Sequence, residues 1–280
     1  MTYDEYDEPD SEPEPEPERE DEFEEQAVDV LGEFFEKNKK RVFYFRQIEV
    51  LHEDSFFHWV TNRALHKVIG GTVRTEERVI GSGRSINFVW HKSLRYYRRE
   101  QRKVAKLVGQ YSEPTVGASL GLNGELIVLE GFARKQFLLM GRHTNAYGGK
   151  VWTDGSSEKT SKSKPPNLDF IFEKDSVAYG MEVKNQLRYP DYKEMQRTIS
   201  MCQFLGLRPV FVVRMMPKSW VHELSRVKGF ALILKYQLYP VSHEVIAKTV
   251  AKELKLPVDS PKELKNSTME RFLKWHKKNL

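Results

Sequence analysis

Three charged residues in an otherwise apolar stretch have the types needed to bind a divalent metal ion. Asp169 lies within a short apolar run, 168–172, and Glu182 and Lys184 stand two positions apart at the end of a second run, 177–183. The polar break between the runs predicts a β-hairpin. Because alternate residues of a strand project from the same face, Glu182 and Lys184 should share a side that Asp169 can approach. Carboxylates and an amine that are half-buried together require a partner or a metal ion.

This arrangement, an Asp followed at 182–184 by Glu-x-Lys, resembles the motif of the PD-(D/E)xK nuclease superfamily. The resemblance extends over residues 118–240, and Leu168 stands where the motif is named for proline. It implies a restriction-endonuclease-like αβββαβ core in which Asp169 and Glu182 bind Mg²⁺, or Mn²⁺ as a substitute, and Lys184 acts beside them. Without the resemblance, the same pattern would describe an amphipathic hairpin with a surface salt bridge.

A helix should precede the hairpin over residues 121–140, where apolar residues recur at helical spacing. By resemblance to the superfamily, this helix carries a further metal-binding acid. Glu125 is the first choice, because it closes a Gly-x-x-x-Glu pattern seen in resolvase-like members; Glu130 is the alternative, and either could face solvent. A first strand is expected at 151–153, followed by a Ser/Lys-rich loop at 156–164 that could meet phosphates.

Downstream of the hairpin, helical and strand patterns alternate. Residues 189–205 and 219–227 have helical patterns, 208–214 is a continuous apolar run typical of a strand covered on both faces, and 230–236 is another strand. This order completes an α/β fold of the kind that the resemblance implies. On the first of these helices Gln203 either positions water or DNA or faces solvent.

Composition places the chain among soluble proteins of a reducing compartment. It has 280 residues, enough for two modest domains, and 39% of them are hydrophobic. Cys202 is the single cysteine, which excludes an internal disulfide and a cysteine-rich zinc site. No apolar run approaches the ~18 residues of a membrane span, and the acidic start lacks the features of a signal peptide. We therefore expect a cytoplasmic protein without a membrane partner.

The net charge of +5 conceals two oppositely charged parts. Residues 1–26 contain fourteen Asp and Glu and one basic residue, Arg19, whereas residues 27–280 hold 44 Lys and Arg against 26 acids. The basic body predicts a polyanionic partner, and DNA is the expected one. The acidic segment has little apolar surface to bury and should be a disordered tail. This tail either competes with nucleic acid for the basic body or only solubilises the chain.

The segment 27–112 shows three helical patterns followed by two strands around a Gly-rich tip. The third helix can be capped by Asp54 or Ser55. In this order the segment resembles a winged helix-turn-helix domain, which implies that the third helix enters the major groove of duplex DNA and that the wing contacts its backbone. Such domains also bind proteins. The expected elements are a helix at 24–39, a short strand and a helix within 42–51, a helix at 56–68, and strands at 72–80 and 85–91.

The residues expected to contact DNA are basic side chains of this third helix and of the wing. Their chemical types suit base edges and phosphates. They are Arg63, His66 and Lys67 on the helix, and Arg78 and Arg84 in the wing.

Two further basic segments complete the chain. A basic helix at 93–111 should connect the two domains, with the boundary at 112–114, where a proline follows Ser-Glu. The last segment, 241–280, is basic and helical, and its apolar residues Phe272 and Trp275 would either pack or form a homodimer.

These patterns predict a disordered tail at 1–26, a winged helix-turn-helix with a linker helix at 27–112, a nuclease domain at 113–240 and an extension at 241–280. The predicted function is metal-dependent hydrolysis of DNA phosphodiester bonds by an endonuclease. The alternatives are a structure-specific resolvase or repair nuclease, and a DNA-binding regulator whose nuclease-like domain is inactive. An RNA nuclease is less favoured, because winged helices more often bind duplex DNA.

Overall fold

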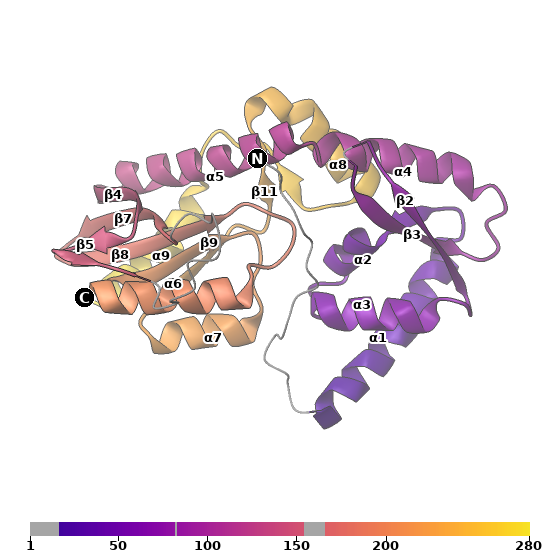
Figure 1. Ribbon diagram of the computed structural model, residues 1–280, viewed down its shortest axis with the longest axis horizontal. Coiled ribbons are helices and arrows are strands. Elements are labelled where there is room, and N and C mark those ends of the chain that lie inside the picture. The colour runs from indigo at the N-terminus through magenta and orange to yellow at the C-terminus, as the bar shows by residue number, and fades with distance from the viewer. Residues whose placement is uncertain (1–16, 82, 154–165) are drawn as a thin grey trace. The chain divides into compact units, whose positions relative to one another are not determined.

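The computed structural model describes residues 17–81, 83–153 and 166–280, with side chains described from residue 22 onward (Figure 1). It is a mixed α/β protein with several sheets. The chain divides into two compact units, and the division falls between Glu113 and Pro114. The short segment Lys252–Leu256 belongs to the first unit, and the remainder of the chain after Pro114 belongs to the second.

The first unit packs helices on a small antiparallel sheet. Ala27, Leu31 and Phe35 recur every four residues on the first helix and are fully buried, so one face of this helix packs in the core. That core includes Ala64 and Leu65 of the third helix. The strands lie in the order β1-β3-β2. The elements are α1 (Pro17–Lys37), β1 (Val42–Tyr44), α2 (Phe45–Leu51), α3 (His58–Val68), β2 (Val73–Val79), β3 (Ser85–His91) and α4 (Tyr97–Tyr111).

Two expectations for this unit need correction. Helix α1 begins at Pro17, so residues 17–26 are helical and the predicted disorder does not extend to residue 26; residues 1–16 lie outside the described part of the chain. Acidic residues extend a helix favourably at its N-terminal end, where they face the positive end of the helix dipole. Helix α3 begins at His58 after Phe57, with no side-chain cap, so neither Asp54 nor Ser55 caps it.

The second unit is built on a five-stranded sheet in the order β10-β9-β8-β7-β4. Strands β4, β7 and β8 are antiparallel neighbours, whereas β8, β9 and β10 run parallel. Figure 1 shows α5 on one face of this sheet and α6 and α7 on the other. The elements are α5 (Pro114–Arg134), β4 (Leu138–Thr144), β5 (Ala146–Tyr147), β6 (Lys150–Val151), β7 (Leu168–Lys174), β8 (Val177–Lys184), α6 (Tyr192–Leu205), β9 (Arg208–Val213), α7 (Lys218–Arg226) and β10 (Phe230–Ile233).

The predicted hairpin is confirmed as β7 and β8. Its turn residues Asp175 and Ser176 have φ of 51° and 60°, which is the left-handed conformation that a two-residue hairpin turn requires. Phe170 pairs with Met181, as the apolar alternation predicts. Gly180 of β8 packs against α6. A Cβ added at this position would lie 2.5 Å from the Cys202 Sγ, so the close approach of helix and strand requires glycine.

The start of the second unit differs from the expectation. Helix α5 begins at Pro114 rather than at 121 and ends at Arg134, and Gln136 takes a left-handed φ of 61° that turns the chain back. Residues Leu138–Thr144 therefore form the edge strand β4 instead of the end of the helix. The strand expected at 151–153 is limited to Lys150–Val151, which pairs with β5 outside the main sheet.

The C-terminal segment is part of the core and not an appended extension. Phe272 of α9 is fully buried, and its ring lies 5.0 Å from that of Phe132 on α5. His276 is also fully buried, with Nδ1 2.6 Å from the Tyr179 hydroxyl and Nε2 2.9 Å from an Asp175 oxygen. Of the two roles expected for these apolar residues, packing is the one observed. The remaining elements are β11 (Gln237–Leu238), a 3-10 turn (Val241–His243), α8 (Glu244–Leu254), β12 (Val258–Asp259) and α9 (Asn266–Lys278).

Within the described residues one helix, α5, is long and apolar enough to cross a membrane. Its Ile127, Val128 and Phe132 are buried in the main core of the second unit. This packing accounts for part of the apolar composition of α5, whose most apolar stretch is 39% buried.

Candidate active site

Asp169, Glu182 and Lys184 meet at one end of the central hairpin. The Lys184 Nζ lies 2.9 Å from a Glu182 oxygen, and the backbone N–H of Val183 donates to the Asp169 Oδ2 at 2.7 Å. Glu182 is 8% exposed. Because β7 and β8 are neighbouring strands, two carboxylates and one ammonium from distant positions converge on one small volume.

Lys184 is surrounded by acids. Besides Glu182, Glu194 on α6 places an oxygen 3.2 Å from the Nζ. Burial alone would lower the pKa of the lysine, but the charges and hydrogen bonds of Glu182 and Glu194 outweigh burial and raise its pKa above the usual value. Lys184 is therefore protonated at neutral pH, so it can donate and neutralise charge but cannot take a proton.

The pKa values of the two acids are also raised, which for a carboxyl group favours the neutral form. Burial raises the pKa of Asp169 to about 6, although the hydrogen bond from the Val183 N–H opposes the rise. Burial also raises the pKa of Glu182 to about 7; Lys184 opposes this rise and the charge of Asp169 adds to it. Burial removes water from each carboxylate, and the hydrogen bonds and charges of the protein compensate for that loss only in part. A cation placed beside the two acids would favour their ionised form.

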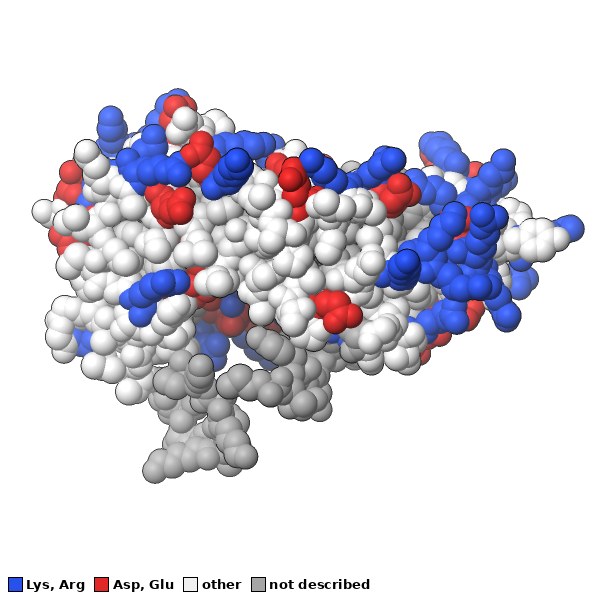
Figure 2. Space-filling view, turned by 90° about the horizontal axis from the view of Figure 1, so that it is seen from above, with Lys and Arg blue, Asp and Glu red and all other residues white. Residues whose placement is uncertain are grey.

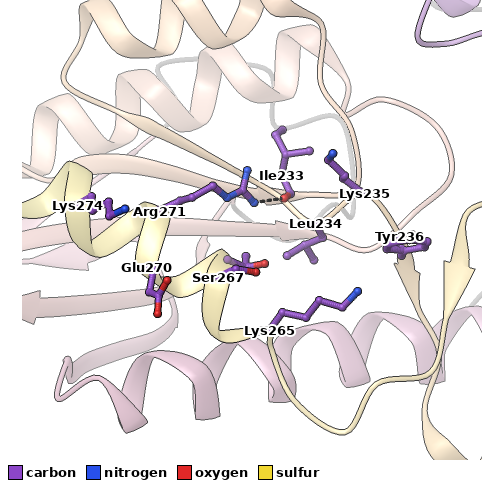
Figure 3. Close-up of a pocket in the computed structure, with 10 residues that line it drawn as sticks. Ile233, Leu234, Lys235, Tyr236, Lys265, Ser267, Glu270, Arg271 and Lys274 are labelled. Carbon is purple, nitrogen blue, oxygen red and sulfur yellow. Dashed lines mark hydrogen bonds between the residues drawn. The ribbon is translucent and has the colours of Figure 1, made fainter.

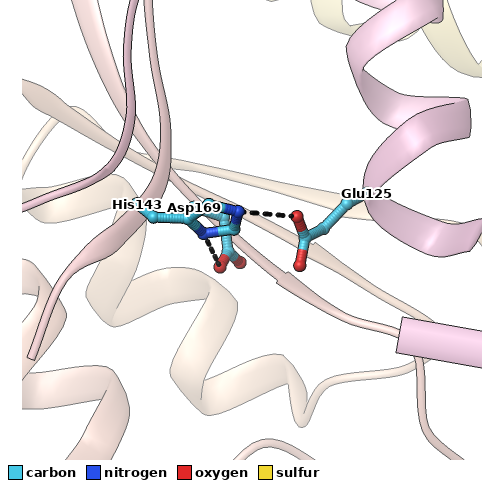
Figure 4. A group of neighbouring side chains, drawn as sticks. All are labelled: Glu125, His143 and Asp169. Atoms are coloured by element: carbon cyan, nitrogen blue, oxygen red, sulfur yellow. Dashed lines mark ion pairs between the residues drawn. The ribbon is translucent and has the colours of Figure 1, made fainter. Parts of the chain in front are cut away.

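A third acid and a histidine complete a group that could hold a metal ion. One ligand atom from each of Glu125, His143 and Asp169 lies within 4.8 Å of the others (Figure 4). The His143 Nε2 is 3.4 Å from a Glu125 oxygen, and its Nδ1 is 4.0 Å from the Asp169 Oδ1. Glu125 also accepts a hydrogen bond from Arg142 at 3.3 Å. Glu182 is not part of this group and is held by Lys184 instead.

The structure separates the two candidate acids of α5. Glu125 faces Asp169, whereas Glu130 is exposed and pairs with Arg134 of its own helix at 3.4 Å. Sequence reasoning missed His143, because the residues before it were assigned to a helix. The apolar run 137–140, followed by Gly141 and the polar pair Arg142-His143, was the available signal for a strand end.

Asn185 fixes the helix that carries Glu125. Its side-chain amide donates to the backbone carbonyls of Leu120 and Leu238, at 2.7 Å each, so α5 is tied to the end of β8. A Cβ at Gly124 would lie 2.8 Å from the Asn185 Cβ, so glycine permits this close approach. Asn185 follows Lys184 directly but was not singled out from the sequence.

The donor set suits a divalent cation of the Mg²⁺ or Mn²⁺ type. Carboxylate oxygens of Glu125 and Asp169 are ligands that Mg²⁺ accepts, and the imidazole of His143 adds a nitrogen donor, which Mn²⁺ tolerates better than Mg²⁺. The raised pKa values of the buried acids also fit a position beside a positive charge.

The residues expected to bind DNA on α3 are held by internal contacts. Arg63 and Lys67 both pair with Glu24 of α1, at 2.8 and 2.7 Å, and Glu24 is only 6% exposed. His66 packs its ring edge-on against Phe45 at 5.4 Å. Part of the positive charge on this face of α3 is therefore paired within the unit, and contact of these residues with DNA stays a prediction.

The other predicted residues have mixed environments. Arg78 of the ribbon is exposed and donates to the Gln101 side chain of α4 at 3.0 Å. Arg84 is half-buried beside the ribbon tip. Gln203 on α6 is exposed, so its expected solvent-facing alternative is the one observed.

A basic cavity of about 510 Å³ lies between the end of β10 and the first turns of α9 (Figure 3). Lys235, Lys265 and Lys274 line it, and Arg271 donates to the Ile233 carbonyl at 2.7 Å. Ile233 and Lys184 both pair with Val213 of β9. The cavity therefore lies at the same end of the sheet as Lys184, and its lining, with four Lys and Arg against Glu270, has a net positive charge that favours anions.

Comparison with known protein families, with characterised proteins and with solved structures finds no match to this chain. The fold and the site by themselves define a mixed α/β protein with a buried acid–lysine cluster at one end of its main sheet.

The raised pKa values of Asp169 and Glu182 make the stability of the metal-free protein depend on pH. The values near 6 and 7 lie above the ~3.9 and ~4.3 of unfolded carboxyls, so between these limits the folded chain holds protons that the unfolded chain has released. Raising the pH from about 4 to about 7 should therefore lower the contribution of these two groups to the free energy of unfolding.

We expect Asp169→Asn to be more stable than wild type at pH 8 in EDTA, by about 2 kcal/mol, with the difference vanishing near pH 4. Urea unfolding at both pH values measures this, and Glu130→Gln, on an exposed acid, is the matched control. Equal stability of the Asn variant and wild type at pH 8 would contradict the burial argument.

Proposed function

We propose that this protein is a metal-dependent endonuclease of the PD-(D/E)xK type that hydrolyses DNA phosphodiester bonds. One observation carries the proposal: Asp169, Glu182 and Lys184 converge at the end of the central hairpin, with Glu125 supplied by the preceding helix. A surface salt bridge, the alternative meaning of the motif, would not bury these groups or raise the pKa values of both acids.

The element order of the second unit supports the same proposal. The succession α5, β4, β7, β8, α6, β9 follows the αβββαβ order of the superfamily, with β4, β7 and β8 as the antiparallel strands. In the first unit, three helices and the β2–β3 ribbon follow the order of a winged helix-turn-helix domain, which we propose as a DNA-binding module.

The proposed chemistry assigns a task to each residue. Asp169 and Glu125 would hold the divalent ion, with His143 or Glu182 beside them. The bound ion would stabilise negative charge on the phosphate and acidify the attacking water. Lys184, protonated and fixed by Glu182 and Glu194, would point its charge at the phosphate and orient the water without taking its proton. Glu182 would keep that ammonium in place.

The basic cavity near α9 supports a polyanionic substrate. It lies at the same end of the sheet as Lys184 and presents the charges of Lys235, Lys265 and Lys274. Phosphates flanking the cleaved one would meet positive charge there.

A substrate panel tests the proposal. The purified full chain is incubated with Mg²⁺ or Mn²⁺ and end-labelled linear duplex, single strand, flap, four-way junction or RNA, with EDTA as the metal-free control. We expect nicks in DNA that require the ion. Cleavage confined to flaps or junctions would identify a structure-specific resolvase or repair nuclease. DNA binding without cleavage of any substrate would overturn the nuclease and favour a regulator.

A further inference from the structure

We propose that the first unit binds the phosphate backbone of nucleic acid through α4 and the β2–β3 ribbon, and not through α3. The proposal rests on the proposed function only in naming nucleic acid as the polyanion. The proposed contact surface is thus on α4, a helix that the sequence predicted only to connect the two domains.

The charge around α4 is almost entirely positive. Between Lys92 and Lys106 there are seven Lys and Arg, all of them exposed, and a single acid, Glu100. Glu100 pairs with Lys103 at 2.7 Å and offsets one of the seven. In Figure 2 the densest group of Lys and Arg lies at the right end of the view, over α4.

The basic residues of α4 lie on one face. At 100° per residue, Arg98, Arg99, Arg102, Lys103 and Lys106 fall within an arc of about 140°. They span nine residues, 98–106, whose eight rises cover about 12 Å along the axis, while duplex DNA carries one charge per ~1.7 Å of its length. A stripe of this length and charge density can therefore meet several consecutive phosphates.

The opposite face of α4 excludes a membrane as the partner. Leu107 and Val108 are buried in the first unit, so α4 has no free apolar face to insert into lipid. Tyr96, just before the helix, is 86% exposed and places an aromatic ring beside the cations, a combination that suits nucleic acid.

The ribbon extends this surface. Arg78 of β2 donates to the Gln101 side chain at 3.0 Å, and Gln101 is fully buried on α4. This bond fixes the arginine beside the stripe, with Arg74 also exposed on the same strand. Glu76, which shares this strand face, lies 3.7 Å from Arg78 and offsets part of its charge, so the ribbon adds less positive charge than the helix does.

Helix α3 is the weaker candidate for phosphate binding because two of its basic side chains already form ion pairs within the unit. Arg63 and Lys67 share the nearly buried Glu24, and the hydrogen bond from Lys67 lowers the pKa of that acid. Binding a phosphate there would require breaking these pairs and leaving a buried carboxylate without its partners, which is costly.

The test measures the affinity of the full chain for a labelled 30-base-pair duplex by fluorescence anisotropy in EDTA, so cleavage plays no part. Arg98→Gln, Arg99→Gln and Arg102→Gln are combined in one variant. We expect an affinity about 10²-fold lower at 0.1 M salt, and a log–log salt slope less steep by about 2 to 3. The matched control replaces three exposed cations of the second unit that lie outside the basic cavity, Lys228, Lys277 and Lys278, by Gln, and should lose less than half of that slope change.

A second variant, Glu24→Gln, releases Arg63 and Lys67 and should change affinity less than 3-fold. A rise in affinity as large as the loss expected for the α4 variant would overturn the proposal in favour of α3. Unchanged DNA affinity of the α4 variant, or a loss seen only on phosphatidylserine vesicles, would also overturn it. Because binding is measured without metal, a protein that never cleaves DNA but shows the α4 effect refutes the nuclease and leaves this inference standing.

Discussion

Replacing Asp169 by Ala, or Lys184 by Ala, is expected to lower the rate of Mg²⁺-dependent DNA cleavage by about 10³-fold or more. Asp169 is the hairpin residue of the proposed metal-binding group with Glu125 and His143, so its loss removes the ion. Lys184 supplies the buried positive charge, and its loss also leaves Glu182 without its ion-pair partner. A 10³-fold loss corresponds to about 4 kcal/mol of transition-state stabilisation.

The measurement is single-turnover cleavage of the best substrate from the panel, with DNA affinity in EDTA as the second readout. Affinity should stay within a few-fold of wild type, because neither residue lies in the basic surface of the first unit. Glu130→Gln is the matched control, since Glu130 is an exposed acid on the same helix as Glu125 and, among the described residues, pairs with Arg134. Undiminished cleavage by both site variants would refute the assignment of the site.

The second large effect is structural: Phe272→Ala should destabilise the second unit by about 3–5 kcal/mol. Phe272 is fully buried, and its ring lies 5.3 Å from Phe230 and 5.5 Å from Tyr179. Truncating it removes apolar burial and leaves a cavity between α9 and the sheet. This loss would show that α9 completes the core, although its sequence is that of a basic extension.

Native-state hydrogen exchange of the β8 and β9 amides reports the free energy of opening of this unit, whatever the stability of the first one. Val245→Ala, at a position of α8 that is 78% exposed, is the control and should change opening by less than 0.5 kcal/mol. Equal protection in wild type and the Phe272 variant would mean that α9 is dispensable.

Local patterns predicted much of this fold. The β7–β8 hairpin with its pairing of Phe170 and Met181, and helix α6 between its Asp191 cap and Gly206, follow from periodicity and turn chemistry within a few residues. Because a two-residue spacing on β8 places Glu182 and Lys184 together, this part of the site was also open to prediction. The boundaries of the helices were harder to predict. Residues 138–140, which begin strand β4, also fit the helical pattern of the preceding segment.

Contacts between distant positions could not be predicted. His143 joins Glu125 and Asp169 only because β4 forms the edge of the sheet beside β7. Glu24 neutralises Arg63 and Lys67 only because α1 packs on α3. Periodicity indicates that a face is buried, but it does not indicate which element covers that face.

The amino-acid sequence alone determined most of the helices and strands, where the charge lies, and that two acids and a lysine share one hairpin. Tertiary structure decided which acid of α5 joins them, which lysines and arginines remain exposed to a polyanion, and that α9 belongs to the core. The reason is physical: propensity and alternation act over neighbouring residues, whereas the energy of a charge depends on its distance from others and on its exposure to water.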